Sequence, residues 1–200
     1  TAQGPSGKAS WDLEDGNCVF VESNQGGISR STPMEFVLDD LDYLQGFSIL
    51  HTSAYSYLDH CLPGFKTLKP RVSYDFSDDF DQDHALSICE YLDFGFFSCA
   101  GWPAESVKAL LQQANARGCG VSVATRGSKE VLLYDGESWL EQPAHRIDPV
   151  DTLGAGDAFI AAFLVSCFGS HPLQGALQRG ADFAAELCRL PGAFGQGLSY

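Results

Sequence analysis

Residues 150–159 combine small residues with carboxylates at a spacing that suits phosphate chemistry. Gly154 and Gly156 flank Ala155, and residues this small let backbone N–H groups approach a ligand closely. An apolar helical run follows, so these N–H groups would stand at the start of a helix, where they lack internal partners and the helix dipole is positive. The stretch therefore predicts an anion pocket made of backbone, which needs no Lys or Arg.

Asp157 places a carboxylate at the same point. A carboxylate is a poor choice for binding an anion alone, because like charges repel. It suits a general base that takes a proton from a hydroxyl while the amides stabilise the charge developing on a phosphoryl group. For an isolated Gly-x-Gly-Asp, a helix cap would be the better interpretation. The full string from Val150 to Phe159 favours the catalytic one.

The elements that position these residues follow from the pattern of the chain after about residue 36, where short apolar runs alternate with helical stretches. This alternation predicts parallel strands joined by helical crossovers. A hairpin with its turn at Asp135–Gly136 is expected at the edge of the sheet. Strands are expected at 47–51, 71–76, 94–98 and 120–125, and helices at about 38–45, 83–92, 104–117, 155–168 and 173–189.

Residues 1–29 differ from the rest of the chain. They are rich in Gly, Ser, Asn and Asp, and the turn-like segment 14–17 separates two short mixed runs. This arrangement predicts a β-hairpin. A loosely ordered terminus is the alternative interpretation.

The charge balance argues against a nucleic-acid partner. The 12 Lys and Arg face 26 Asp and Glu, which gives a net charge of -14. Phosphate-backbone binding needs clustered cations, so this chain would repel a polyanion. The longest strongly apolar run, 158–168, is shorter than the roughly 20 residues that span a bilayer, so no membrane partner is expected. We see no secretory leader, that is, no basic segment followed by an apolar one. Because the chain begins with Thr1 and not with Met, an N-terminal segment that is missing from this sequence is a further expectation.

The seven cysteines are scattered, and none forms a Cys-x-x-Cys pair or a cluster with zinc spacing. Single cysteines in apolar surroundings are usually small buried hydrophobic residues. We therefore expect a reducing, cytoplasmic environment.

The segment Asp151–Asp157 resembles, without interruption, the second hallmark motif of the ribokinase-like (PfkB) carbohydrate and nucleoside kinases. Within that family, Tyr74–Asp78 and the run of segments look most like the fructoselysine kinases. The resemblance covers nearly the whole chain, with the N-terminal portion of the family absent. It implies a ribokinase-like three-layer α/β/α sandwich with a mainly parallel sheet and a small β lid. The lid hairpin, in part, would be residues 1–29, and the core 30–200.

The resemblance also implies roles for the motif residues. Asp157 would be the base that activates the acceptor hydroxyl, and the amides of Gly154, Ala155 and Gly156 would form the anion hole. Asp151 matches a position that helps some members hold a monovalent cation, so K⁺ is left open as a cofactor beside ATP and Mg²⁺.

A second set of residues resembles the nucleotide site of the family. Thr125-Arg126-Gly127 matches the start of the loop Thr-x-Gly-x-x-Gly, which would place Thr125 and Gly127 near ATP. Taken alone, this tripeptide is better interpreted as a turn at the end of a strand. Ser98 stands near the usual Asn-x-x-Glu of the family and would also lie at the cofactor. The segment 192–195 either borders the adenine pocket or is only a loop.

Two departures from the family pattern concern phosphate and metal. Glu130 stands where the nucleotide loop usually has its second Gly, and an acidic side chain there would repel phosphates unless it points away. Gly101 replaces the Glu that normally helps organise Mg²⁺. Candidates to replace that Glu are Asp75, Asp78 and Glu105.

These observations predict an ATP-dependent kinase that phosphorylates a hydroxyl of a small sugar or sugar derivative. A nucleoside kinase of the same family remains an alternative. A non-catalytic nucleotide-binding relative is another alternative, suggested by Glu130, Ser98 and Gly101. An inactive fragment of a longer kinase is a third. Lid hairpins of the family often make dimer contacts, so a homodimer through residues 1–29 is a further expectation.

Overall fold

The computed structural model describes residues 3–32, 34–169 and 171–195. The chain forms two compact units, which are described separately. The first comprises Thr1–Lys8, Asn24–Arg126 and Leu132–Leu140, and the second Ala9–Ser23, Gly127–Val131 and Glu141–Tyr200, within the described ranges. The first contains most of the sheet, and the second the hairpin and two long helices.

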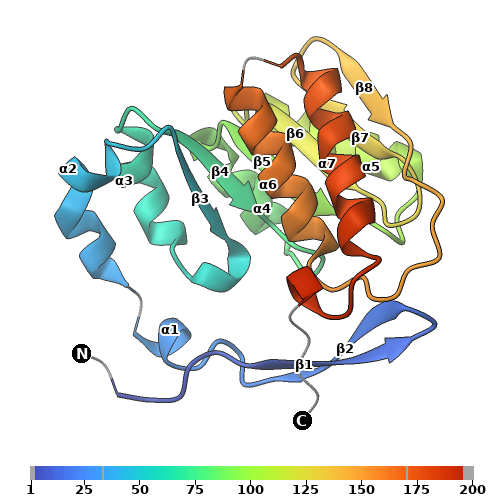
Figure 1. Cartoon of the computed structure of the whole chain (residues 1–200). Helices are drawn as coiled ribbons and strands as arrows, with labels where there is room; N and C mark the ends of the chain where they lie inside the picture. The colour runs from blue at the N-terminus through green and yellow to red at the C-terminus, as the bar shows by residue number, and fades with distance from the viewer. Residues whose placement is uncertain (1–2, 33, 170, 196–200) are drawn as a thin grey trace. The chain divides into compact units, whose positions relative to one another are not determined.

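The sheet has six strands in the order of the sequence (Figure 1). The first four are parallel to one another, and β7 runs antiparallel to β6. The central strand β5 is buried over its apolar residues on both faces, as is usual in a parallel sheet. The strands are β3 (Ile49–Ser53), β4 (Arg71–Asp75), β5 (Phe94–Ser98), β6 (Val121–Thr125), β7 (Val131–Tyr134) and β8 (Trp139–Gln142).

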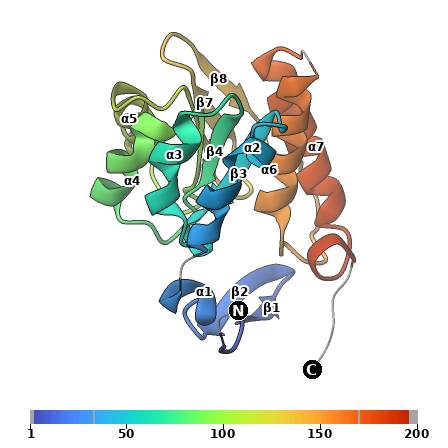
Figure 2. The same cartoon turned by 90° about the vertical axis from the view of Figure 1, so that its left-hand side faces the viewer.

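Three helices of the first unit lie on one face of this sheet (Figure 2). They are α3 (Leu62–Lys66), α4 (Gln82–Ile88) and α5 (Ala104–Ala116). In α5 the buried residues recur at helical spacing, at Val107, Leu110, Leu111 and Ala114. Two shorter helices, α1 (Ile28–Ser31) and α2 (Leu41–Leu44), precede the sheet.

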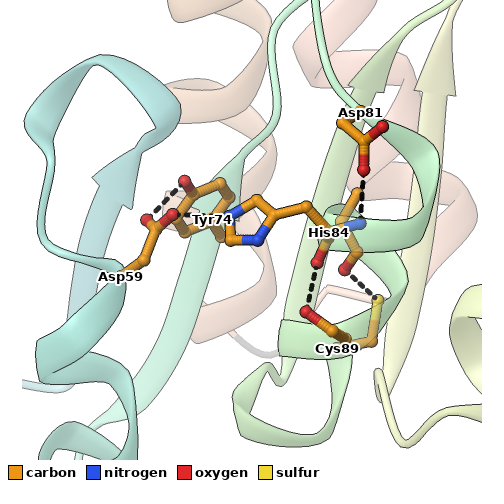
Figure 3. A network of polar contacts seen from close by, with 7 residues as sticks. Asp59, Tyr74, Asp81, His84 and Cys89 are labelled. Atoms are coloured by element: carbon orange, nitrogen blue, oxygen red, sulfur yellow. Dashed lines mark hydrogen bonds and ion pairs between the residues drawn. The ribbon is translucent and has the colours of Figure 1, made fainter.

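A polar network ties β4 to α4 and to the short 3₁₀ turn Asp59–Cys61 (Figure 3). The buried Tyr74 hydroxyl donates to Asp59 Oδ1 at 2.7 Å, and His84 Nε2 lies 2.8 Å from Asp59 Oδ2. Asp81 caps α4 by accepting a hydrogen bond from the His84 amide at 2.7 Å. Burial, reinforced by the hydrogen bond to Asp59, raises the pKa of Tyr74 far above its ordinary value.

The second unit contains the antiparallel hairpin of β1 (Ala9–Glu14) and β2 (Asn17–Ser23) and the helices α6 (Ala155–Phe168) and α7 (Leu173–Leu187). The two helices lie side by side (Figure 1). They approach closely because Gly180 of α7 has no side chain where the Phe159 ring of α6 packs. None of the described helices is both long and apolar enough to cross a membrane.

Most of the expected elements are present, with local differences. The helix expected at 83–92 is α4 over 82–88, followed by a 3₁₀ turn at Cys89–Tyr91, and α1 was not expected. The strand expected at 47–51 occupies 49–53, because it pairs with β4 from Ile49 onward. The helix expected at 38–45 is a 3₁₀ helix, Glu35–Asp40, followed by the single turn of α2. Helix α3 was not expected, because Pro63 and Gly64 within it disfavour a helix in the sequence alone.

Candidate active site

Helix α6 begins at the glycine-rich motif, in the conformation that the small residues favour. Gly154 caps the helix in the left-handed region, with φ 79° and ψ 4°. A residue with a Cβ is strained in that region, so glycine is required there. The first bond of the helix runs from the Ala158 amide to the Gly154 carbonyl oxygen at 2.9 Å. The chain thus turns sharply into the helix at the residue that the sequence singled out.

The amides at this helix start are not all equivalent. The Ala155 amide donates to the Thr152 carbonyl oxygen at 3.1 Å and so closes the turn before the helix. The amides of Gly156 and Asp157 donate to no atom of the described chain. A Cβ at Gly156 would have no heavy atom within 4 Å, so the side-chain position of this exposed residue faces open space. Geometry, dipole and space together suit an anion.

Asp157 lies in the first turn of α6, and its side chain is exposed. Within the described chain the carboxylate has neither a hydrogen-bond nor an ion-pair partner. It therefore does not act as a conventional cap, which would accept a hydrogen bond from a nearby amide. The group remains available to a ligand bound at the helix start.

Asp151 is buried and fixes the loop in front of the helix. Its Oδ1 accepts from the Leu153 amide at 2.8 Å, and its Oδ2 accepts from the Gly192 amide at 2.9 Å. Burial, with a smaller contribution from the Asp151 charge, raises the pKa values of the Cys18 and Cys188 thiols. Each carboxylate oxygen keeps further acceptor capacity, so the group fits a K⁺ site as well as a structural role.

In the first unit, the register of the sheet brings Ser98 and Thr125 together. They are the last residues of β5 and β6 and stand opposite each other. The Cys99 amide donates to the Thr125 carbonyl oxygen at 2.8 Å and so continues this pairing past the strand ends. Ligands of parallel α/β sheets bind outside such carboxyl ends. Gly127 belongs to the second unit and has φ 63°, which favours glycine there.

Arg126, Glu130 and Gly101, which lie near Ser98, Thr125 and Gly127 in the sequence, differ in burial and contacts. Arg126 is buried and donates from Nη2 to the Trp102 carbonyl oxygen at 3.0 Å. Glu130 is partly buried, and Gly101 is exposed with nothing within 4 Å of where its Cβ would lie. The described residues hold no group of three His, Cys, Asp or Glu that could bind a metal. Mg²⁺ is commonly bound by only one or two carboxylates together with phosphate oxygens of the substrate and water, so a cluster of three such residues is not required for it.

The structure therefore groups the expected residues in two sets. Ser98 and Thr125 stand together in the first unit, and Asp151 and residues 154–157 stand together in the second. Two contacts of the second set could not be inferred from the sequence. Thr152 receives a hydrogen bond from the Cys18 amide, and Gly192 donates one to Asp151. Both partners are remote along the chain, and no local pattern predicts them.

Comparison with known proteins decides the family. Residues 93–195 match the family model described as pfkB family carbohydrate kinase. The chain belongs to this family. It is 37% identical over 200 residues, 100% of this chain and 70% of the relative, to "Fructosamine kinase FrlD" of Bacillus subtilis (strain 168). It is 28% identical over 97% of its length, and 73% of the relative, to "Fructoselysine 6-kinase" of Escherichia coli (strain K12).

Solved structures place the pfkB-family chain in the ribokinase-like α/β fold, as expected. A ribokinase from Thermotoga maritima matches with a TM-score of 0.72 at 20% identity, over 96% of this chain and 66% of that one. An adenosine kinase from Anopheles gambiae matches with a TM-score of 0.75 at 18% identity, over 100% of this chain and 67% of that one. The chain thus spans about two thirds of the length of these structures and a little more of the curated relatives.

Proposed function

We propose that this pfkB-family chain transfers the γ-phosphoryl group of ATP to a hydroxyl of a sugar derivative. The observation that supports it most is the start of α6, where two free amides, open space and an exposed carboxylate without a partner occur within one helical turn. Phosphoryl transfer depends mainly on positioning and charge stabilisation, and this turn can supply both.

In the proposed mechanism the acceptor hydroxyl lies against Asp157. As the hydroxyl oxygen bonds to the γ-phosphorus, its proton passes to the Asp157 carboxylate, and the bond to the bridging oxygen breaks to release ADP. The amides of Gly156 and Asp157 would donate to the equatorial oxygens of the transferred group, where negative charge develops. The Ala155 amide, engaged with Thr152, would fix the turn that aims the other two. Gly154 would supply its own amide to the same anion hole.

Cofactor roles belong to the same proposal. Mg²⁺ would neutralise charge on the phosphate oxygens. Thr125, Gly127 and Ser98 would lie along the nucleotide, and Asp151 would hold a K⁺ ion next to the loop that leads into α6. Because Asp151 already orders that loop through two amides, an ion on its carboxylate would act on the same backbone.

The substrate class that we propose is a fructosamine such as fructoselysine. Support comes from the two relatives that align over nearly the whole chain and whose names specify fructosamine and fructoselysine. A nucleoside acceptor is the second candidate, since a "Cytidine kinase" of Thermococcus kodakarensis is 39% identical over 89 residues. A non-catalytic nucleotide-binding protein is the third, favoured by Glu130, Ser98 and Gly101.

The test is ADP release by the chain with ATP and Mg²⁺, with and without K⁺, in the presence of fructoselysine, fructose, ribose or adenosine. We expect release that depends on fructoselysine. Asp157→Asn should lower kcat by about a hundredfold to ten-thousandfold and leave ATP affinity nearly unchanged, because general-base catalysis contributes that much.

A matched control is Glu186→Gln, which neutralises another exposed carboxylate on a helix of the same unit. It should behave like the unaltered protein. Equal turnover in the protein with Asp157→Asn would contradict the mechanism. ATP binding without ADP release from any acceptor would favour the non-catalytic candidate.

Two further proposals concern surroundings and assembly. The hairpin exposes Trp11, Leu13 and Phe20, an apolar set that suits contact with a second copy of the chain. A cytoplasmic location is the second, as the scattered single cysteines of the sequence suggest.

A further inference from the structure

The β1–β2 hairpin contacts the segment just before α6 through two residues. Every residue of 9–23 is exposed except Gly16 and Cys18, which are partly buried. The Cys18 amide donates to Thr152 Oγ1 at 2.9 Å, across 134 positions of sequence. A Cβ at Gly16 would overlap the Pro149 carbonyl oxygen, so the two backbones touch directly. The hairpin therefore makes a specific contact with this segment, through Gly16 and Cys18 on one side and Pro149 and Thr152 on the other.

Thr152 contacts both the hairpin and the start of α6. Its side chain accepts from the hairpin, and its carbonyl oxygen accepts from the Ala155 amide at 3.1 Å. The two bonds use opposite parts of one residue. A displacement of the hairpin therefore acts on the same residue whose carbonyl oxygen closes the turn into α6.

We propose that Thr152 is a positioning residue through which docking of the hairpin orders the amides and the carboxylate at the start of α6. This inference deepens the proposed function and depends on it only for its kinetic consequence. The proposed phosphate site would then be ordered when the hairpin contacts residues 149–152 and less ordered when it does not.

The physical reason lies in the flexibility of residues 152–154. Gly154 has a wide choice of backbone conformations, so the turn into the helix needs external contacts to hold it. Asp151 restrains one side of this turn through the Leu153 amide, and the Thr152 hydroxyl restrains the other through the hairpin. Loss of either contact leaves the Ala155 amide bonded to a less ordered carbonyl.

The first experiment compares Thr152→Val with Thr152→Ser in the full chain. Valine keeps the branched shape without an acceptor, and serine keeps the acceptor. Amide hydrogen exchange measured by NMR at Cys18 and Ala155 is the readout. We expect Thr152→Val to speed exchange at both amides by about fivefold to tenfold, as the net worth of one hydrogen bond implies. Thr152→Ser should stay close to the unaltered protein.

A second variant disturbs the same contact by a change in the hairpin and leaves Thr152 unaltered. Gly16→Ala must push the turn of the hairpin away from Pro149, because no room exists for the added methyl group. It should speed exchange at Ala155 although Thr152 is intact. Asp12→Ala, an exposed change on β1, is the matched control and should leave Ala155 unchanged.

The kinetic readout is separate. Thr152→Val should lower kcat by about tenfold or more with little change in the KM for ATP, since misplaced catalytic groups slow the chemical step. Faster exchange at Cys18 with no change at Ala155 would overturn the coupling, and so would unchanged kcat with faster exchange at both. If the unaltered protein phosphorylates no acceptor, the proposed function fails, while the exchange measurements still decide whether the hairpin orders the turn.

Discussion

Gly101 stands at a position where the sequence resemblance leads us to expect a glutamate, and the structure leaves room for a larger side chain there. A Cβ there would meet nothing within 4 Å, and the backbone conformation does not require glycine. Gly101→Glu should therefore fold normally, with a change in stability within about 0.5 kcal/mol, as for most surface substitutions. If the glutamate of other members assists Mg²⁺, the variant should lower the Mg²⁺ concentration for half-maximal activity by about threefold or more.

The measurement is a Mg²⁺ titration of ADP release at saturating ATP. Gly101→Gln is the control, because it has the same length without the charge and should not lower the requirement. Identical Mg²⁺ titrations for both variants would contradict a role in Mg²⁺ binding for a glutamate at this position.

At the same scale, the structure changes how two motif residues are understood. The sequence suggested three equivalent amides, at 154, 155 and 156, but that of Ala155 is used within the turn. The sequence suggested Asp151 as a cation ligand, and the carboxylate also joins the motif to Gly192. The first detail depends on the exact geometry of a local turn and the second on a contact between distant segments, and residue type and spacing specify neither.

At the scale of elements, α6 and α7 pack closely because Gly180 has no side chain at their contact. A Cβ at Gly180 would lie 2.7 Å from the Phe159 ring and 3.1 Å from the Phe159 carbonyl oxygen. Gly180→Ala should destabilise the protein by about 1–3 kcal/mol, because the buried ring has to move. Since α6 begins at the proposed anion site, we expect activity to fall together with stability.

Gly175 on the same helix is the matched control. Its nearest neighbours are atoms of Pro172 at 3.8 Å, which is ordinary contact. Gly175→Ala should stabilise the protein by about 0.5–1 kcal/mol, since alanine loses less entropy in a helix. Urea unfolding of both variants checks the pair. Shifts of the same sign would mean that helix propensity, not packing on Phe159, decides both positions.

The elements that the sequence predicted best have strong local signals. Helix α5 has a regular apolar face and α6 follows glycines, and both occupy 104–116 and 155–168, close to the expected ranges. The elements predicted poorly, α3 and the 3₁₀ helix before α2, are short and depend on packing against the rest of their unit. Local pattern therefore predicted the long helices better than the short elements that connect the strands.

At the scale of the whole molecule, a net charge of -14 conflicts with an anionic substrate such as ATP. The proposed anion site would resolve the conflict at short range, because backbone amides at a helix start can bind an anion without a cationic side chain. They do not remove the long-range repulsion between the acidic surface and the approaching nucleotide. The two effects act over different distances and can be separated by ionic strength.

Raising ionic strength from about 0.01 M to 0.1 M shortens the screening length from about 30 Å to 10 Å. We expect kcat/KM for ATP to rise over this range, because the repulsion is screened before the short-range contacts are affected. The measurement should use choline chloride at fixed Mg²⁺ and K⁺, with the zwitterion betaine as a control for solute effects. A fall in kcat/KM with salt would instead indicate a local cationic attraction for ATP that outweighs the acidic surface, and the backbone would then not be the main source of phosphate binding.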